Sequence, residues 1–319
     1  MLAGSPAIHP TALCLGVFDG VHRGHSAIIH AARRFIAGIP SGRVLSLTFD
    51  PHPSRVIRPE SAQALLQPLK SRVGLLRDAG CDEVIVLPFT EDLAKQSPEA
   101  FWSILKGAVP GRILGIFAGQ NWRFGVGRSG NLAHLASLSS TEGSVVIGVP
   151  PVMHQGKVIS SSWIRELVRD AAFREIPPLL GRALELSGTV VTGQQLARQW
   201  GVPTANLQPE QECLPPNGVY AGWTRIEGKP PLWSVCNLGT RPSLTAEETR
   251  PLLEAHLFNF SENLYGQTLH FVPVHRIREE RRFASLDALR DQIALDIEHA
   301  QQSLTTLDAS PVCNWSGTP

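Results

Sequence analysis

Two histidines three residues apart, His22 and His25, stand in the segment Gly-Val-Phe-Asp-Gly-Val-His-Arg-Gly-His at residues 16–25. The segment follows an apolar run at residues 12–17 that predicts a buried strand, and it precedes residues 26–39, whose apolar side chains repeat with helical spacing. Glycines let the backbone of a turn approach a ligand, and the first turn of a helix offers free N–H groups and a positive dipole end to an anion. The segment therefore predicts a phosphate site with two imidazole donors.

These residue types suit a nucleotidyl transfer. An acceptor phosphate is already ionised, so the protein mainly has to stabilise charge around the α-phosphorus and the departing pyrophosphate. Two histidines and a helix N-terminus supply that stabilisation. An isolated His-x-x-His pair is more often a helix-start coincidence or half of a metal site, but the strand and glycines around this pair favour the phosphate interpretation.

Residues 16–25 resemble the signature of the HxGH nucleotidyltransferase superfamily, in the form typical of the prokaryotic bifunctional riboflavin kinase/FMN adenylyltransferase (FAD synthetase) family. The resemblance implies that ATP is the co-substrate and that His22 and His25 are catalytic. It also implies ATP or phosphate contacts at the other positions of the motif, which are Gly16, Phe18, Asp19, Gly20 and Gly24.

Two further segments of the first half agree with a nucleotide site. Residues 119–125, Gly-Gln-Asn-Trp-Arg-Phe-Gly, are similar to a family block in which the position of Asn121 contacts the nucleotide; the alternative is a loop-capping asparagine. Residues 159–165 open a helix and gather hydroxyls, N–H groups and a guanidinium, as in the family's Ile-Ser-Ser-Thr-x-Ile-Arg, so Ser161, Ser162 and Arg165 are expected at the ATP phosphates. The Gly-x-Gly-x-x-Gly at residues 125–130 does not open directly off a strand, which argues against a Rossmann dehydrogenase.

The second half carries a kinase-like block. Residues 201–207, Gly-Val-Pro-Thr-Ala-Asn-Leu, resemble the Gly-[Phe/Val]-Pro-Thr-Ala-Asn signature of riboflavin kinases, which implies that Thr204 and Asn206 hold Mg²⁺ and the nucleotide phosphates. Side-chain oxygens are suitable ligands for Mg²⁺, although such a turn on its own is usually an ordinary loop. The resemblance places further ATP or flavin contacts at Gly193, Gly201, Pro203, Asn237 and Arg241.

A kinase of this type also needs a base, because the ribityl 5′-hydroxyl is a poor nucleophile. Glu254 is the candidate by its matching position, and its alternative is an exposed strand residue. The charged run at residues 276–282 is by default a solvated surface, although the resemblance implies that its first arginine-rich part lies near the flavin-binding loop. Ala197 and Trp200 depart from the family's glycine-rich flap, which has glycine and leucine at these positions. These two changes motivate an alternative in which the barrel has lost the kinase activity.

The pattern of elements predicts two modules. Strands alternate with helices over the first half, which indicates a doubly wound parallel sheet with its ligand site off the carboxyl ends of the strands. Short strands and one final helix in the second half indicate a small closed barrel, and the resemblance implies a Greek-key riboflavin kinase barrel. A Pro-Pro and a glycine predict a boundary near Gly181, which gives an adenylyltransferase domain at 1–181, a kinase domain at 182–304 and a loose tail at 305–319.

Composition limits the partners. The 319 residues have a formal net charge of +1 and five widely spread cysteines, so neither a nucleic-acid footprint, nor a disulfide framework, nor a zinc site is indicated. No signal peptide and no apolar run of about 20 residues is found. We expect a cytoplasmic protein with small-molecule partners and with no nucleic-acid or membrane partner, and a weak homo-oligomer stays open.

Together these observations predict a bifunctional enzyme. It would phosphorylate riboflavin to FMN and adenylylate FMN to FAD, using ATP and Mg²⁺, with the flavins as substrate and product. Two alternatives stay open: an FMN adenylyltransferase whose barrel is only a flavin-binding module, and a non-enzymatic flavin-sensing or nucleic-acid-binding protein, which the near-neutral charge and the intact histidine pair argue against.

Overall fold

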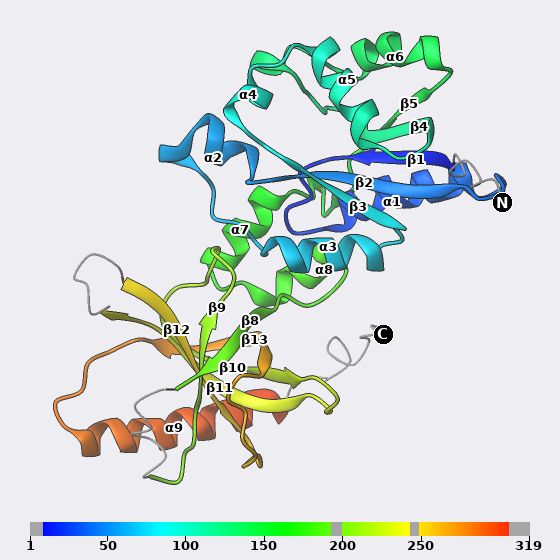
Figure 1. The fold of residues 1–319 in the computed structure, drawn as a ribbon. Helices are drawn as coiled ribbons and strands as arrows, with labels where there is room; N and C mark the ends of the chain where they lie inside the picture. The colour runs from blue at the N-terminus through cyan, green and yellow to red at the C-terminus, as the bar shows by residue number, and fades with distance from the viewer. Residues whose placement is uncertain (1–8, 193–199, 243–248, 306–319) are drawn as a thin grey trace, which may run out of the picture. The chain divides into compact units, whose positions relative to one another are not determined.

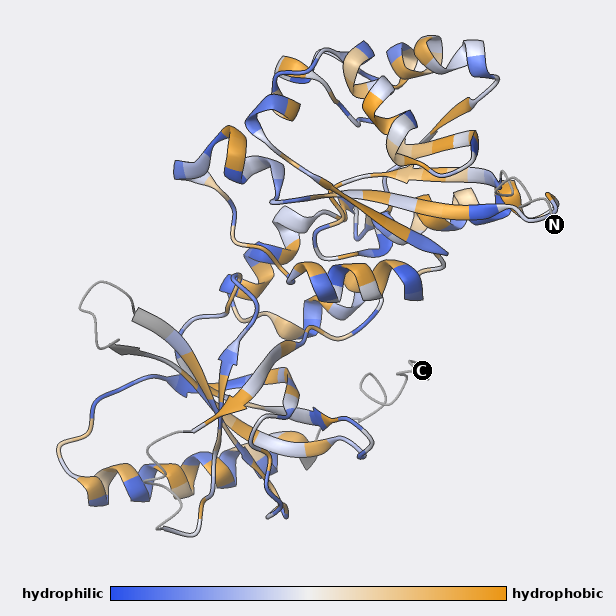
Figure 2. Ribbon diagram, viewed as in Figure 1, coloured by the Kyte–Doolittle hydropathy of each residue, from blue (hydrophilic) through white to orange (hydrophobic). Residues whose placement is uncertain are grey.

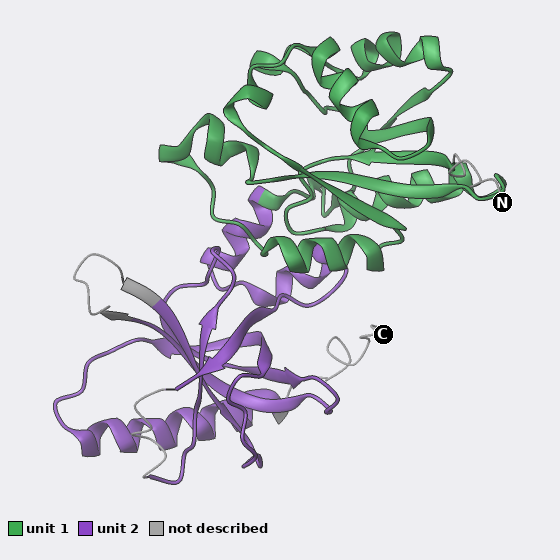
Figure 3. Ribbon diagram, in the orientation of Figure 1, with its two compact units in different colours: residues 1–161 green, residues 162–319 purple. Residues whose placement is uncertain are grey.

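The structure, a computed structural model, describes residues 9–192, 200–242 and 249–305. It divides into two compact units, residues 1–161 and residues 162–319 (Figure 3). Each unit has its own sheet and its own core. The domain boundary that the sequence predicts near Gly181 stays a prediction.

The first unit is built on a parallel sheet of five strands in the order β3-β2-β1-β4-β5 (Figure 1). The predicted doubly wound parallel sheet is confirmed. The chain leaves β1 toward β2 on one side, while β4 lies on the other side of β1, so the carboxyl ends of β1 and β4 flank the crevice at which such sheets bind ligands. The strands are β1 (Pro10–Leu15), β2 (Arg43–Asp50), β3 (Glu83–Pro88), β4 (Arg112–Gly119) and β5 (Val145–Val149).

Helices cover both faces of this sheet. Along β1, Leu13 and Leu15 belong to the core under α5 (Pro98–Ala108) and α6 (Leu132–Ser139), whereas Ala12 and Cys14 belong to the core under α1 (Arg23–Ile36) and α3 (Leu69–Asp78). The strands that face these two cores are predominantly apolar (Figure 2). The shorter elements are α2 (Pro53–Ile57), η1 (Pro59–Ser61), α4 (Glu91–Ala94), η2 (Val126–Arg128), η3 (Ser140–Glu142) and the hairpin of β6 (Met153–His154) and β7 (Lys157–Val158).

The second unit is a closed antiparallel barrel with the strand order β10-β11-β12-β9-β8-β13. The predicted small barrel with a terminal helix is confirmed: α9 packs Ala300 and Leu304 against Val219, Ala221 and Val235 of the barrel wall. The elements are α7 (Ser161–Arg169), η4 (Phe173–Glu175), α8 (Pro177–Leu180), β8 (Leu186–Val191), β9 (Ala205–Pro209), β10 (Gly218–Ile226), β11 (Leu232–Pro242), β12 (Thr249–Leu257), β13 (Thr268–Glu279) and α9 (Leu286–Thr305).

Strand β9 was not predicted, because Pro-Thr-Ala-Asn has the composition of a turn. The strand forms nonetheless, since it pairs with β12 on one side and with β8 on the other. The last three residues of the kinase-like block, residues 205–207, are the first three of β9. This end of the block therefore lies on the barrel wall and not in a loop. Within the described residues, no helix combines the length and the apolar character that crossing a membrane requires.

Candidate active sites

The turn that follows β1 has an unusual backbone. Phe18, Gly20 and Val21 all have positive φ angles, of 56°, 88° and 36°. A side chain at Gly20 would stand 2.8 Å from Leu66 Cδ1, so glycine is needed there for space as well as for conformation. Phe18 is completely buried. The turn is therefore a compact structure that delivers the chain to the start of α1 in one defined direction.

His22 and His25 form a single surface at the N-terminus of α1. His22 is the N-cap residue, and its carbonyl oxygen accepts hydrogen bonds from the backbone N–H groups of His25 and Ser26 at 2.7 and 3.0 Å. The two imidazole rings stack with centroids 3.7 Å apart and planes inclined by 16°. A side chain at Gly24 would lie 3.0 Å from the His22 ring, so the glycine leaves the space that this ring occupies.

The histidines line a cavity of about 290 Å³, here called the histidine pocket. Asn121, which follows β4, lies on its wall, as the position of β4 beside β1 requires. Segments separated by about a hundred residues thus meet in one place, as the sequence predicts for a site at the strand ends. The predicted residues that line the histidine pocket are Gly16, His22, Gly24, His25 and Asn121.

Other residues of the predicted site do not line this pocket. Asp19 is buried, and its carboxylate accepts hydrogen bonds from the Leu66 N–H at 3.1 and 3.3 Å. Ser161 Oγ donates to the Asp19 carbonyl oxygen at 2.7 Å. With the buried Phe18, these groups hold the shape of the turn. Ser162 and Arg165 follow on α7, the first exposed and the second buried, and their phosphate role stays a prediction.

A larger cavity of about 760 Å³, here called the aromatic pocket, shares Val17 and Trp122 with the histidine pocket. Trp122 and Phe124 stack in its wall with ring centroids 4.9 Å apart. Its size suits a small-molecule ligand. Sequence reasoning missed this pocket, whose lining also includes the proline-flanked His52 in the segment after β2. Aromatic and cationic lining residues are Phe49, Phe89, Phe101, Trp122, Phe124, Arg58, Lys95, Arg123 and Arg128.

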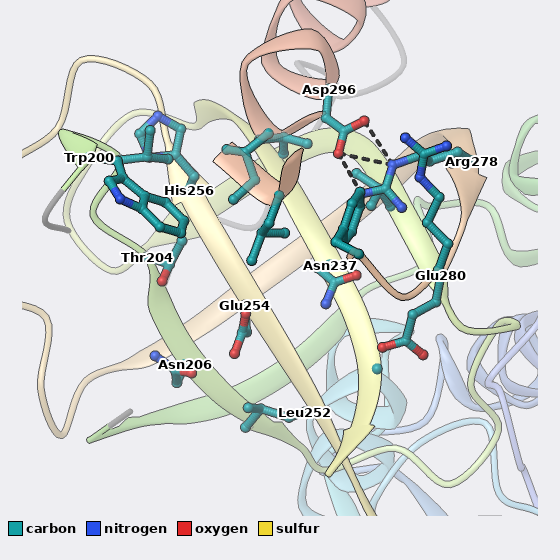
Figure 4. Close-up of a pocket in the computed structure, with 18 of the residues that line it drawn as sticks. Trp200, Thr204, Asn206, Asn237, Leu252, Glu254, His256, Arg278, Glu280 and Asp296 are labelled. Carbon is teal, nitrogen blue, oxygen red and sulfur yellow. Dashed lines mark hydrogen bonds and ion pairs between the residues drawn. The ribbon is translucent and has the colours of Figure 1, made fainter. Parts of the chain in front are cut away.

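The third cavity, here called the barrel pocket, has a volume of about 400 Å³. Glu254 on β12 lies directly opposite Asn206 on β9 and directly opposite Asn237 on β11. Directly opposite residues of paired strands point to the same face of a sheet, and all three side chains line the pocket together with Thr204 (Figure 4). The barrel thus brings together the candidate base, both candidate metal ligands and one predicted flavin or ATP contact.

Asn206 is the most informative member of this group. Its side chain is 5% exposed, and its Oδ1 atom has no hydrogen-bond partner among the residues that the structure describes. A buried acceptor without a protein partner is rare in native proteins, and a water, an ion or a ligand can satisfy it. The described residues hold no group of three or more His, Cys, Asp or Glu side chains that could bind a metal ion, so a cation here would rely on neutral oxygens such as these and on its own phosphate ligands.

The turn before β9 is fixed from the side. The Nδ1 atom of His256 lies 2.8 Å from the Pro203 carbonyl oxygen, and burial lowers the pKa of His256 more than this hydrogen bond raises it. A neutral imidazole that donates from Nδ1 follows from both facts. Gly201 has a φ of 76° and, like Pro203, is exposed and does not line the pocket.

The departures from the family pattern fall partly inside this site. Trp200 lines the barrel pocket. Gly193 and Ala197 lie outside the described residues, so their expected places in the flap stay predictions. Arg241 belongs to β11, where its backbone pairs with Arg250, and its flavin or ATP contact also stays a prediction.

The charged run at residues 276–282 begins within β13 and continues past its end. Sequence patterning alone predicts a solvated surface here, but Arg278, Glu280 and Arg281 line the barrel pocket. Arg278 makes a two-pronged ion pair with Asp296 of α9, with Nε to Oδ1 at 2.9 Å and Nη2 to Oδ2 at 2.7 Å (Figure 4). Asp296 is 3% exposed. Arg281 and Phe283 also line the pocket, so α9 and the segment before it close one side of the cavity. Charge alternation alone gave no signal for this role, whereas the family resemblance implies that the first arginine-rich part of the run lies near the flavin-binding loop.

A parallel-sheet unit with a pocket at its strand ends and a closed barrel with a pocket of its own form the two modules of a transferase. Family models match both modules: FAD synthetase over residues 5–163 and riboflavin kinase over residues 180–304. The chain belongs to the bifunctional riboflavin kinase/FMN adenylyltransferase family.

Individual relatives agree over most of their length. The bifunctional riboflavin kinase/FMN adenylyltransferase of Escherichia coli K12 is 34% identical, over 89% of this chain and 90% of the relative. The protein of the same name from Pseudomonas fluorescens is 36% identical, over 90% of this chain and 91% of the relative. Among solved structures, one described as a macrolide-efflux protein from Streptococcus pneumoniae superposes with a TM-score of 0.78 at 28% identity, over 93% of this chain and 95% of that chain.

Proposed function

We propose that this chain phosphorylates riboflavin to FMN in its barrel and adenylylates FMN to FAD in its parallel-sheet unit, with ATP as the donor in both reactions. The observation that carries the proposal is the convergence of two independent residue sets, one in the histidine pocket and one in the barrel pocket. Each set lies within the part of the chain that matches the corresponding family model.

In the adenylyl transfer, a phosphate oxygen of FMN attacks the α-phosphorus of ATP, and the bond to the β-phosphate oxygen breaks to release pyrophosphate. No protein base is needed, because the attacking phosphate is already ionised. His22, His25 and the N-terminus of α1 stabilise the negative charge that shifts onto the pyrophosphate. Asn121 binds the nucleotide, and Ser161, Ser162 and Arg165 keep their predicted phosphate role in this proposal.

The aromatic pocket is proposed as the FMN site of this reaction. A planar, partly apolar flavin ring suits the Trp122 and Phe124 wall, and the cationic side chains at the rim suit its phosphate. Since Val17 and Trp122 belong to both pockets, a flavin phosphate at this shared wall would face the α-phosphorus of an ATP molecule in the histidine pocket.

In the phosphorylation, Glu254 takes the proton of the ribityl 5′-hydroxyl. The hydroxyl oxygen attacks the γ-phosphorus of ATP, and ADP leaves. Asn237, directly opposite Glu254, is placed to orient either the carboxylate or the flavin. Glu254 and Asn206 are opposite each other on paired strands, so the base and the phosphate-holding residue keep a fixed separation.

Thr204 and Asn206 are proposed to hold Mg²⁺ with the ATP phosphates. The buried Asn206 Oδ1 without a protein partner fits this assignment, since hard side-chain oxygens and phosphates are the ligands that Mg²⁺ uses. When bound, the ion neutralises phosphate charge. The protein's own part is to present these oxygens beside Glu254 on neighbouring strands.

The proposal includes the predicted domain boundary near Gly181, which ends α8 with a φ of 78°. Such a left-handed C-cap glycine is a common end to a helix before a new segment. It also includes reactions in the cytoplasm with small-molecule partners alone and with no nucleic acid or membrane, in keeping with a net charge of +1. A weak homo-oligomer stays an open part of the prediction.

The test is to incubate the purified protein with riboflavin, ATP and Mg²⁺ and to separate the flavins over time. FMN followed by FAD is the expected result. If riboflavin stays unchanged while added FMN becomes FAD, Trp200 and the other change in the flap have abolished the riboflavin kinase activity. The single-activity alternative is then right. If neither flavin changes, the enzyme proposal is wrong.

A further inference from the structure

A completely buried arginine lies under the histidine motif. Arg72 of α3 is 1% exposed, and a charged side chain is almost never buried this far unless it is paired. Burial lowers the pKa of Arg72, while the nearby carboxylates of Asp19 and Asp50 raise it. Both carboxylates belong to elements of the adenylyltransferase site, so the contacts of the guanidinium show what it holds.

Its direct hydrogen bond goes to the motif turn. Nη1 of Arg72 donates to the Val17 carbonyl oxygen at 3.1 Å. The same oxygen accepts a second hydrogen bond, from Thr48 Oγ1 at 2.8 Å. A carbonyl oxygen with both lone pairs engaged from two different elements is fixed in position. Val17 is therefore held between α3 and β2 at the point where the chain leaves β1.

The guanidinium also reaches the end of β2. Nη2 of Arg72 lies 3.6 Å from Asp50 Oδ1, and Asp50 directly precedes the segment whose His52 and Pro53 line the aromatic pocket. The remaining capacity of Arg72 is not satisfied: Nε and Nη2 make no hydrogen bond to the described parts of the chain. An incompletely bonded buried guanidinium is costly to stability, which argues for a functional reason to keep it.

Val17 lines both the histidine pocket and the aromatic pocket. Arg72 thus fixes the one backbone segment that the two cavities share on this side, and it neutralises Asp19 under the motif and Asp50 beside the aromatic pocket. We propose that Arg72 is a positioning residue for adenylyl transfer, which keeps the walls of the two pockets aligned so that the flavin phosphate meets the α-phosphorus of ATP. This inference rests on the proposed function.

The test compares Arg72→Met, which keeps most of the side-chain volume, with Arg72→Lys, which keeps the charge and a donor. Misalignment of reacting groups by about 1 Å costs about 10²-fold in rate, so Arg72→Met is expected to lower kcat for FAD formation by about 10- to 100-fold. Its Kd for FMN, from flavin fluorescence quenching, should change by less than about threefold, since binding and alignment are separate. Arg72→Lys should recover much of kcat. The riboflavin kinase rate of each Arg72 variant, measured in the same preparation, reports how much of that variant is folded and active.

Arg43→Met is the matched control. Arg43 is the first residue of β2, at the opposite end of the strand from Thr48 and Asp50. It pairs with Glu83 at 3.1 Å, and its side chain is 36% exposed. It should leave kcat for FAD formation unchanged. If folded Arg72→Met has the wild-type kcat for FAD formation, this inference is wrong and the proposed function stands. The same conclusion follows if Arg72→Lys and Arg72→Met lose kcat equally and if thermal unfolding shows that the loss matches a loss of folded protein. Wild-type protein that forms no FAD overturns the proposed function and this inference with it.

A second route avoids the risk that Arg72→Met does not fold. Thr48→Val removes only the other donor to the Val17 carbonyl oxygen. If that oxygen must be held, Thr48→Val lowers kcat for FAD formation several-fold, and the double variant with Arg72→Lys loses more than the two single changes combined, because the sites share one acceptor. Independent effects in the double-mutant cycle would contradict the proposal.

Discussion

Glu254 lies directly opposite Asn206, on the antiparallel strands β12 and β9. One is the only acidic side chain among the predicted kinase residues, and the other carries a buried oxygen without a hydrogen-bond partner in the described chain. Paired strands hold such residues at a nearly constant separation. The barrel therefore holds the proposed proton acceptor beside the proposed phosphate- or metal-binding oxygen without help from a loop.

Glu254→Gln tests the proton acceptor. The substitution keeps size and removes the basic carboxylate, so the riboflavin kinase kcat should fall by about 10²- to 10⁴-fold, the usual contribution of a positioned base. FAD formation from added FMN should stay at the wild-type rate, measured by flavin separation. Glu262→Gln, an exposed glutamate paired with Lys229, is the matched control. Equal kinase rates for Glu254→Gln and the control would exclude Glu254 as the base.

Asn206→Leu tests the buried oxygen. It keeps the volume and removes an acceptor that is without a protein partner in the described residues, so thermal unfolding of the ligand-free protein should occur at the same or a higher temperature, because an unsatisfied buried polar group costs about 1–3 kcal/mol. The kinase should nevertheless lose activity at low Mg²⁺, with a half-saturating concentration raised by about tenfold or more. A lower unfolding temperature together with an unchanged Mg²⁺ titration would show that Asn206 is structural.

The histidine motif was predictable because its signals are local. A strand, a glycine turn and a helix follow one another within residues 10–36, and the order of strands that follows places Asn121 beside them. Arg72 was not predictable in this way, since a basic residue in an amphipathic helix normally faces solvent. Only the packing of α3 under the motif turn buries it.

The aromatic pocket escaped the sequence for a related reason. Its wall combines Phe49 from β2, Phe101 from α5 and Trp122 from the loop after β4, and no short-range pattern joins these positions. Aromatic side chains at such spacing normally indicate core, which several of them also are. A cavity between core residues depends on how elements pack, and periodicity alone carries no information on that.

The stacked imidazoles of His22 and His25 lead to a test of the adenylyltransferase site. His22→Ala and His25→Ala should each lower kcat for FAD formation by about 10²- to 10³-fold, the typical cost of losing one donor to a developing negative charge. The kinase rate should not change. His30→Ala, on an exposed position of the same helix, is the control. Because the two rings are in contact at 3.7 Å between centroids, the double variant should lose less than the product of the two single effects.

Trp122→Ala tests the proposed flavin wall. Removal of the indole deletes the stacking partner of Phe124, so Kd for FMN should rise by about 10-fold, consistent with about 1.4 kcal/mol of lost contact. The quenching of FMN fluorescence by the protein, titrated in buffer without ATP, measures this Kd. Phe35→Leu, which changes an aromatic side chain in the other core of the sheet, serves as a control. An unchanged Kd for FMN in Trp122→Ala would place the flavin elsewhere.

His256 predicts a pH dependence of the barrel. Burial lowers its pKa below the ordinary value of 6.5 more than the hydrogen bond to Pro203 raises it, so the unfolded chain takes up the proton first as the pH falls. The stabilising contribution is therefore complete above about pH 6.5 and is lost as the pH falls through the pKa of the folded state. Urea unfolding of the barrel, followed at pH 7.5 and at lower pH values, should show a decreasing free energy of unfolding.

The substitution that isolates this effect is His256→Gln, which can still donate to the Pro203 carbonyl oxygen but does not titrate. It should flatten the pH dependence between neutral pH and pH 5, and the kinase should keep its Mg·ATP saturation at low pH better than the wild type, because the turn before Thr204 no longer loses its support. His275→Gln, at an exposed position of β13, should leave the wild-type pH dependence intact. If His256→Gln and His275→Gln give the same slope of unfolding free energy against pH, the buried imidazole is not the group that titrates.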